Sequence, residues 1–399
     1  MGNAKSPVNI IYMSISDIET TGLKTEDLVI NMGPQHPSTH GVLRLKLILQ
    51  GEIVKECEPV IGYLHRGMEW LAQNRNFVQY QALVDRVDYL AGMSDSHAYV
   101  SAVEQIAGLE VPERAEYLRI LTAELNRICS HQLSLGIFML DLGAMMGFPF
   151  YAFRDRESIL SVLEEISGQR MMFNYMRIGG VHKDVPKGWY TKVEKLVKEK
   201  LLGFTDEYED IITNNPIFTS RTKGVGVIDA TQGRLFGLTG PNIRASGVDY
   251  DIRTAKPYSK YNEFDFKVVT RTEGDIFARY KCRVDEIRES CKIILQAIEK
   301  IRALPGGEEA QGPKDLQAKK IMPGFKAPAG ETYFAVESPR GELGVHLITD
   351  GTAVPYRLKW RSPSWFPTNF LPEMAVGKPI ADIVAIFSSL DVILPDVDR

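Results

Sequence analysis

The sequence contains only four cysteines, Cys57, Cys129, Cys282 and Cys291, and no two of them form a C-x-x-C pair. Zinc ribbons, ferredoxin-type clusters and redox-active dithiols use closely spaced cysteines, so the sequence excludes these three kinds of site. Cys282 and Cys291 fall in one predicted helix. At about 100° per residue their spacing puts them on opposite faces, where they cannot chelate one metal ion. We expect four reduced, mostly buried thiols.

Signatures of nucleotide and nucleic-acid binding are also missing. The chain has no G-x-G-x-x-G or Walker loop, no long run of Lys or Arg, and a net charge of −4. The first 25 residues carry two Lys, no Arg and two acidic residues, unlike a secretory signal or an Arg-rich transit peptide. We therefore expect no NAD site, no nucleic-acid partner and a cytoplasmic-type compartment.

One apolar stretch, residues 133–153, is about as long as a membrane span. Asp141 lies near its centre, three glycines interrupt it, and Pro149 lies close to its end. A carboxylate in the middle of a lipid-exposed helix would be costly, so we expect the stretch to be buried within protein. Asp141 then has two readings. It is the N-cap of a helix that starts at Leu142, or a buried carboxylate that orients and charges a histidine.

Composition and periodicity predict a globular α+β protein. Of the 399 residues, 44% are hydrophobic and 25% are charged, which is ordinary for a chain with a sizeable core. We expect a central helical bundle flanked by N-terminal and C-terminal antiparallel β elements. The expected segments are an N-terminal extension at 1–26, a β-hairpin region at 27–60, a helical bundle at 61–213, an irregular or β segment at 214–275, a helix at 276–303, a linker at 304–330 and a C-terminal β region at 331–399.

A nine-residue loop at 33–41, GPQHPSTHG, combines two prolines, two glycines and two histidines. Such a composition is typical of a stiff, shaped loop. His36 and His40 have the spacing of metal ligands on a helix, but Pro37 disfavours a helix and no third ligand is near. The loop is either an ordinary connection or a holder that aims a histidine at a ligand.

A charged cluster at 80–89, YQALVDRVDY, brings Asp85, Arg86, Asp88 and Tyr89 onto one or two helical turns. The carboxylates and the guanidinium can pair locally on a solvated helix face. Alternatively, Tyr89 projects its hydroxyl into a cavity. Three other polar stretches, 65–67, 154–157 and 177–182, suit a polar interface or an anion-stabilising wall, and on sequence alone we expect structural roles for them.

Seven motifs, in this order along the chain, resemble one known family. They are GPQHPSTHG at 33–41, IGYLHRGME at 61–69, DRVDY at 85–89, ELNRI at 124–128, LDLGAMMGFPF at 140–150, RIGGVH at 177–182 and the closing DVDR at 396–399. They closely resemble the family of D subunits of NADH-quinone oxidoreductase, the respiratory complex I. The resemblance runs from about residue 27 to the C-terminus.

The resemblance implies a fold and a site. The family shares ancestry with nickel-iron hydrogenase large subunits, which hold their metal with two cysteine pairs that this chain lacks, so a membrane-bound hydrogenase is excluded and we expect no metal site. In the family the emptied region is a quinone cavity. By motif, His40 and Tyr89 would bind the quinone headgroup, Asp141 would stand behind His40, and Arg66 would approach the iron–sulfur cluster of a neighbouring subunit.

The implied activity is that of an assembly. The resemblance implies a peripheral-arm subunit of a proton-translocating NAD(P)H- or ferredoxin-quinone oxidoreductase, on the cytoplasmic side of a bacterial or archaeal cell membrane. The implied partners are a small-subunit-like protein with the terminal [4Fe–4S] cluster, other hydrophilic subunits and a membrane-arm subunit at the quinone entrance. Menaquinone, ubiquinone or plastoquinone is the implied substrate. Two alternatives stay open: a ferredoxin- or deazaflavin-linked relative, and a non-catalytic scaffold subunit.

The sequence departs from the family at one position. Many members have a histidine two residues after the Arg of an S-G-x-R motif, whereas this chain has Met172 after Arg170. A methionine cannot bind a proton when the nearby cluster is reduced. Proton-coupled tuning of the cluster potential is therefore in doubt, and a low-potential acceptor such as menaquinone is the expected substrate.

Overall fold

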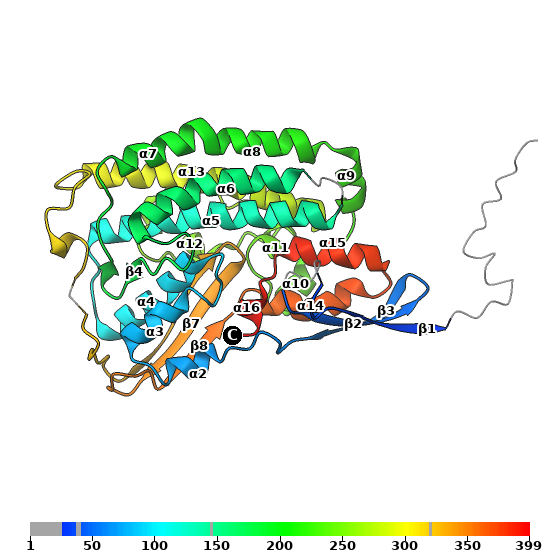
Figure 1. Cartoon of the computed structure of the whole chain (residues 1–399), viewed down its shortest axis with the longest axis horizontal. Helices are drawn as coiled ribbons and strands as arrows, with labels where there is room; N and C mark the ends of the chain where they lie inside the picture. Colours follow the sequence, from blue (N-terminus) through cyan, green and yellow to red (C-terminus); the bar gives the residue numbers. More distant parts are fainter. Residues whose placement is uncertain (1–25, 37–40, 144–146, 319–320) are drawn as a thin grey trace, which may run out of the picture.

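The computed structural model describes residues 26–36, 41–143, 147–318 and 321–399. Long helices form one layer of the molecule, and a three-stranded sheet with shorter helices lies beneath them (Figure 1). A second three-stranded sheet projects from one end (Figure 1). This mixture of helices and antiparallel sheets confirms the predicted α+β class.

The strands and helices have the following bounds. The strands are β1 Asp27–Met32, β2 Arg44–Gln50, β3 Ile53–Val60, β4 Met176–Arg177, β5 Gly180–Val181, β6 Gly330–Ser338, β7 Gly341–Thr349 and β8 Arg357–Arg361. The α-helices are α2 Met68–Ala72, α3 Phe77–Val84, α4 Gly92–Ala107, α5 Glu113–Asp141, α6 Phe148–Ser167, α7 Trp189–Leu196, α8 Leu202–Tyr208, α9 Pro216–Thr222, α10 Ala230–Leu235, α11 Pro241–Arg244, α12 Ile252–Ala255, α13 Ile276–Ala303, α14 Trp365–Ala375, α15 Ile380–Leu390 and α16 Leu394–Val397. Two π-helical segments, η2 Val197–Leu201 and η3 Glu209–Thr213, continue α7 and α8, and 3₁₀ turns lie at η4 Tyr261–Glu263 and η5 Pro313–Asp315.

The projecting sheet has the order β1-β2-β3 with antiparallel pairing throughout. Leu45, Leu47 and Leu49 of β2 are buried, as the alternation of apolar and charged residues predicts. Val54 of β3 exchanges backbone hydrogen bonds with the loop after α14, donating to Lys378 O at 2.9 Å and accepting from Gly377 N at 2.8 Å. This contact fixes the end of the sheet at the β2–β3 turn to the C-terminal part of the chain.

The helical layer is built on α5 and α13, which pack against each other and are apolar at helical spacings. On α13 the buried isoleucines include Ile287, Ile294, Ile298 and Ile301, and Asp275 caps the helix by accepting a 2.7 Å hydrogen bond from Ala278 N. Residues 276–303 thus form the helix that the sequence predicts.

All four cysteines are buried and none forms a disulfide, as predicted. Burial raises the pKa of each thiol to about 12, so the thiols stay protonated and unreactive at neutral pH. Within the described ranges, no three His, Cys, Asp or Glu side chains are grouped so as to hold a metal ion.

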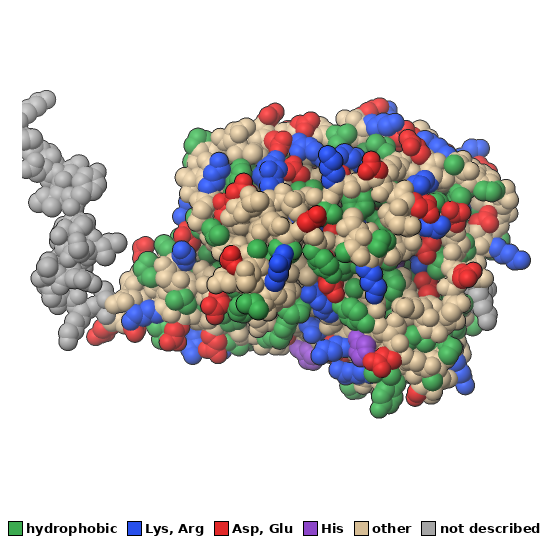
Figure 2. Space-filling view, turned by 180° about the vertical axis from the view of Figure 1, so that it is seen from behind, with side chains coloured by type: hydrophobic (Ala, Val, Ile, Leu, Met, Phe, Trp, Pro, Cys, Tyr) green, Lys and Arg blue, Asp and Glu red, His purple; other side chains and the backbone are tan. Residues whose placement is uncertain are grey.

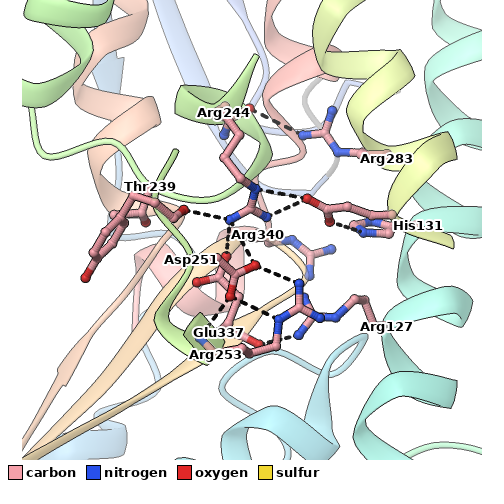
Figure 3. A network of polar contacts seen from close by, with 12 residues as sticks. Arg127, His131, Thr239, Arg244, Asp251, Arg253, Arg283, Glu337 and Arg340 are labelled. Atoms are coloured by element: carbon pink, nitrogen blue, oxygen red, sulfur yellow. Dashed lines mark hydrogen bonds and ion pairs between the residues drawn. The ribbon is translucent and has the colours of Figure 1, made fainter. Parts of the chain in front are cut away.

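A buried ionic network joins the helical layer to the sheet (Figure 3). Arg244 lies at its centre, 2.5 Å from Glu286 of α13 and 2.6 Å from Glu337 of β6. Arg253 extends the network from Asp251, at 2.7 Å, to Glu124 of α5, at 3.1 Å. Removing one partner of such a buried pair leaves an uncompensated charge and destabilises a protein by about 3–5 kcal/mol. The network therefore fixes β6 against α5 and α13.

The hairpin of β6 and β7 turns through two residues, Pro339 and Arg340, between the paired Ser338 and Gly341. Gly341 has a φ of +127°, and a Cβ added to it would lie 2.5 Å from Thr239 Oγ1 and 2.8 Å from Gly240 N. Only glycine allows this backbone conformation and this close approach together. The tip of the hairpin is therefore held in one position against the loop before α11.

Two sequence predictions need correction. Residues 214–275 contain the short helices α9 to α12, rather than short strands, because side-chain caps such as Asn215 and Asp229 start helices there. The C-terminal segment 331–399 is β structure only up to Arg361 and then helical through α14, α15 and α16. Its helix α15 carries apolar residues at helical spacing, with Ile383, Ile386 and Phe387 buried.

The outer surface carries acidic and basic side chains of both signs, intermixed over the helical layer (Figure 2). None of the helices in the described part of the chain is both long and apolar enough to cross a membrane. The stretch 133–153 is divided between the end of α5 at Asp141 and the start of α6 at Phe148.

Replacing Gly341 with alanine is expected to lower the free energy of unfolding by about 2 to 4 kcal/mol, because both the positive φ and the contact with Thr239 become unfavourable. Denaturant unfolding of the purified chain measures this. Gly351 is the matched control, since it has a φ of +87° but nothing within 4 Å of an added Cβ. Gly351→Ala should cost about 1 kcal/mol. Equal effects of the two changes would contradict the close packing at the hairpin tip.

Candidate functional site

A cavity of about 270 Å³ lies where α5, the segment after α3, the β6–β7 hairpin tip and the segment after α15 meet. Its lining residues are Tyr89, Leu90, Leu133, Ser134, Ile137, Arg340, Asp391, Val392 and Ile393. One wall is apolar, from α5 and from the segment 392–393, and the other carries a phenol, a guanidinium and a carboxylate. A small planar ring with polar oxygens at its edge fits this combination of walls.

Tyr89 reaches the cavity because α3 ends before it. The last residue of α3 is Val84, and Asp85 is its C-cap, so the charged cluster 85–89 does not lie on a solvated helix face. Asp85 and Asp88 are buried, whereas Arg86 donates to Ala82 O and does not pair with either. The expected local pairing is therefore wrong. Tyr89 is half-buried at the cavity wall, as the alternative reading predicts.

Arg340 bridges the two carboxylates that flank Tyr89 in space. Its Nη1 donates to Asp88 Oδ2 at 2.5 Å and its Nη2 to Asp391 Oδ1 at 3.3 Å, while its Nε donates to Asp391 O at 2.9 Å. A weaker contact of 3.3 Å joins Nη1 to Ser130 Oγ on α5. The guanidinium thereby ties the hairpin tip to the segment after α3, to α5 and to the end of α15.

Burial and the neighbouring charges shift the pKa values of Asp88 and Tyr89 at the cavity. Burial raises the pKa of Asp88 to about 6, and Arg340 opposes the rise. Burial and the adjacent charge of Asp88 also raise the pKa of Tyr89, and both Arg340 and Arg66 oppose that rise. The Tyr89 hydroxyl is therefore protonated at neutral pH and can act as a hydrogen-bond donor.

Asp141 ends α5 on the same stripe that lines the cavity, four residues after Ile137 and eight after Leu133. It is the last residue of the helix, so its reading as the N-cap of a helix from Leu142 is wrong. The hydroxyl of Ser388 on α15 donates to Asp141 Oδ2. The carboxylate is partly exposed beyond the end of the apolar wall.

His40 lies outside the described residues, and the described residues on either side of it are His36 and Gly41. His36 and Gly41 form an antiparallel bridge at the base of the loop. A Cβ added to Gly41 would lie 3.4 Å from Leu394 Cβ, and the preceding residue, Ile393, lines the cavity. Gly41, the residue after His40, therefore lies beside the cavity wall.

Arg66 does not line this cavity. Its Nη1 donates to Arg86 O at 2.6 Å and its Nη2 to Pro395 O at 2.8 Å, so it joins the motif 61–69 to the motif 85–89 and to α16. Burial lowers the pKa of its guanidinium, and the surrounding carboxylates, of which Asp95 is the strongest, oppose that effect.

The closing motif DVDR clamps the motif IGYLHRGME. Asp398 Oδ2 accepts hydrogen bonds from Gly62 N at 2.8 Å and from Leu64 N at 2.7 Å. Arg399 Nε donates to Glu69 Oε1 at 3.2 Å. Two motifs at opposite ends of the sequence therefore form one structural unit, which holds Arg66 in place.

The stretch 177–182 lies at a different cavity, of about 320 Å³, whose lining includes Arg177, His182 and Gln81. Burial lowers the pKa of both Arg177 and His182. Met172 lies near this region in a backbone conformation with a φ of +55°. The segment is held by Asn174, whose backbone N donates to Asp85 Oδ2 at 2.5 Å.

The apolar stretch 133–153 is only partly buried. Leu140 is 46% exposed, Phe150 76% and Phe153 37%, so this chain alone does not bury the whole stretch. Two of these exposed side chains, Phe150 and Phe153, lie in the first two turns of α6.

Sequence reasoning missed Arg340 and Asp391 as site residues. Both lie at turns, Arg340 at the hairpin tip and Asp391 at the C-cap of α15 with a φ of +54°. No local pattern links them to Tyr89, because only the fold brings the three together. The tripeptide Pro339-Arg340-Gly341, with a proline and a glycine, indicates a turn. It predicts a tight hairpin but not what the arginine faces.

Comparison with known proteins gives one consistent family. Residues 141–399 match the family described as the respiratory-chain NADH dehydrogenase 49 Kd subunit. The second of the NADH-quinone oxidoreductase D subunits of Koribacter versatilis is 46% identical over 389 residues, covering 93% of this chain and 96% of the relative. The D subunits of the NADH-quinone oxidoreductases of Geobacillus thermodenitrificans and Dehalococcoides mccartyi are each 47% identical, with 94% of this chain and all of the relative covered.

Removing the Asp398 carboxylate is expected to release the clamp on residues 61–69. Asp398→Ala leaves two backbone N–H groups without their acceptor, which costs about 1 to 3 kcal/mol. Hydrogen–deuterium exchange should become faster at the amides of Gly62 and Leu64, with the variant Asp350→Ala as a control from a remote exposed turn. Unchanged exchange at both amides would show that the clamp does not hold this motif.

Proposed function

This chain belongs to the family of NADH-quinone oxidoreductase D subunits, the 49 Kd subunits of respiratory NADH dehydrogenase, and we propose that it forms the quinone-reduction site of such a complex. The neighbouring wall of the site belongs to a small-subunit-like protein that carries the terminal [4Fe–4S] cluster. The fold in this proposal is that of a nickel-iron hydrogenase large subunit without its metal-binding cysteines. The chain supplies no redox centre, so electrons reach the site from the partner's cluster.

The cavity at Tyr89 is the observation that carries this proposal. It joins a phenol hydroxyl, which is protonated at neutral pH, to the apolar α5 face of Leu133 and Ile137. The volume of about 270 Å³ suits a single ring headgroup rather than a whole isoprenoid quinone. An isoprenoid tail would therefore extend out of the chain, towards a membrane-arm subunit.

Reduction of a quinone to a quinol takes up two electrons and two protons. In the proposed mechanism Tyr89 O–H and a ring N–H of His40 each donate a hydrogen bond to one carbonyl oxygen of the quinone. Each then transfers its proton as negative charge develops on that oxygen. Asp141 orients His40 and favours its charged form. Tyr89 and His40 are afterwards reprotonated from water.

The proposal also covers the contact with the partner's cluster, the location of the complex, the quinone and the electron donor. Arg66 is the residue nearest the partner's cluster. The complex acts at the cytoplasmic side of a bacterial or archaeal cell membrane, where it couples quinone reduction to proton translocation together with other hydrophilic subunits and a membrane-arm subunit. Met172 in place of a titratable histidine favours menaquinone as the acceptor. NADH is the proposed donor, and a ferredoxin or deazaflavin input module is compatible with the same site.

A Tyr89→Phe variant is expected to assemble normally and to reduce quinone about 10²-fold more slowly, because only the proton donor is lost while the ring still fills its place. The measurement is quinone-dependent turnover of the purified complex. Donor oxidation with ferricyanide, which bypasses the quinone, serves as the assembly check. Tyr356→Phe, at a tyrosine that is 66% exposed, is the matched control. Full turnover of Tyr89→Phe at saturating quinone would remove Tyr89 from the site.

The proposed His40–Asp141 pair predicts non-additive effects. Asp141→Asn should lower the pKa of His40, so turnover should fall most at higher pH, where the histidine is no longer charged. His40→Ala should lower turnover at every pH. The double variant should be little worse than His40→Ala alone, since the two groups act as one unit. Effects that simply multiply would show that Asp141 acts independently of His40.

A further inference from the structure

The β6–β7 hairpin places Arg340 at the cavity that Tyr89 lines. The two-residue turn at Pro339 and Arg340 leaves little freedom, and the packing of Gly341 against Gly240 holds the tip in place. The Arg340 side chain is only 2% exposed, yet it forms part of the cavity wall beside Tyr89. A buried cation is thereby placed within reach of whatever occupies the cavity.

The charges around Arg340 are mostly negative. Asp88 and Asp391 contact it directly, and Asp396 of α16 is a third carboxylate close enough to interact with it. Three other basic side chains interact with this group. Arg283 Nε of α13 lies 3.9 Å from Asp391 Oδ2, Arg66 interacts with Tyr89 and Asp396, and Arg399 interacts with Asp396. Tyr89 is a further ionisable neighbour of Arg340, and Asp95, whose Oδ2 accepts a 2.6 Å hydrogen bond from Asp88 N, is a fourth carboxylate beside this group. Without Arg340, the wall beside Tyr89 would carry uncompensated negative charge.

The other buried arginines of the ionic network differ from Arg340 in their surroundings. Arg244 and Arg253 are surrounded by Glu286, Glu337, Asp251 and Glu124. None of these residues lines the cavity. Arg340 is thus the buried arginine of this part of the fold that faces both an acidic cluster and a substrate-sized space.

We propose that Arg340 is a positioning and charge-balancing residue of the quinone site. This inference rests on the quinone site proposed above. Arg340 holds Asp88, and with it the adjacent Tyr89, in place. It also neutralises Asp88 and Asp391, so that the negative charge that develops on a quinone oxygen during reduction is not repelled by the wall.

This role predicts a pH dependence that a purely structural arginine would not produce. In an Arg340→Met variant, Asp88 and Asp391 lose their cation and repel the developing negative charge as long as they are ionised. Lowering the pH protonates Asp88 and removes its share of the repulsion. Arg340 opposes the burial that raises the pKa of Asp88 to about 6, so its loss moves that pKa further up. The deficit in turnover should therefore be large at high pH and should shrink as the pH falls.

The test compares quinone turnover of the assembled complex at several pH values between about pH 6 and about pH 8.5. Arg340→Met is expected to reduce quinone turnover about tenfold at the highest pH of this range and clearly less at the lowest pH. Arg340→Lys, which keeps the charge, should retain most of the turnover. Adding Asp391→Asn to Arg340→Met removes one unpaired carboxylate and should restore part of the loss at high pH.

The matched control is Arg119→Met, which removes a fully buried arginine from its pair with Glu104, at 2.6 Å and outside the cavity. Because Glu104 lies outside the cavity, any loss of quinone turnover there should be matched by an equal loss of ferricyanide reduction at each pH. Ferricyanide reduction again reports assembly. If Arg340→Met does not assemble, the same pH series is measured on Arg340→Met/Asp391→Asn, in which Asp88 still lacks its cation.

A deficit that is constant with pH, or full turnover of Arg340→Met, would overturn the role of Arg340. A Tyr89→Phe variant measured in parallel separates this result from failure of the proposed function. Impaired Tyr89→Phe together with unaffected or pH-independent Arg340 variants leaves the quinone site in place and rejects only the inference on Arg340. Fully active Tyr89→Phe rejects the site itself.

Discussion

The ion pairs of Arg340 with Asp88 and Asp391 are the interaction on which the candidate site depends. They join three parts of the chain that are far apart in sequence: the segment after α3, the β6–β7 hairpin and the end of α15. Each part contributes a wall of the cavity. Because buried carboxylates without a partner are unfavourable, the guanidinium both assembles these walls and fixes where negative charge lies next to Tyr89.

Two further sets of contacts in the fold hold the walls of the cavity in place. The network around Arg244 fixes β6 against the helical layer (Figure 3). The close approach of Gly341 to Gly240 fixes the hairpin tip. The clamp between Asp398 and the motif 61–69 then holds Arg66 against Pro395, next to the residues that line the cavity. A site made of separate turns needs such support, because turn residues have few contacts of their own.

Much of the secondary structure follows from local patterns. The strands at 27–32, 44–50 and 330–338 and the helices α5 and α13 lie where alternation and helical periodicity predict them. Short helices started by single side-chain caps, such as α10 at Asp229, were not predictable from periodicity because they are less than two turns long. The motifs indicated Tyr89 and Asp141. Arg340 could not be found from the sequence, since its partners are about 250 and 50 residues away and only tertiary packing brings them together.

The central claim is that a quinone headgroup binds in the cavity at Tyr89, and photolabelling tests it most directly. A photoreactive short-chain quinone is bound to the assembled complex, irradiated, and its attachment sites are mapped by mass spectrometry with and without excess unlabelled quinone. The account predicts labelling in the segments 89–90, 133–137 and 391–393 that the excess quinone abolishes. Labelling that is confined to other parts of the chain, or that excess quinone does not reduce, would contradict it.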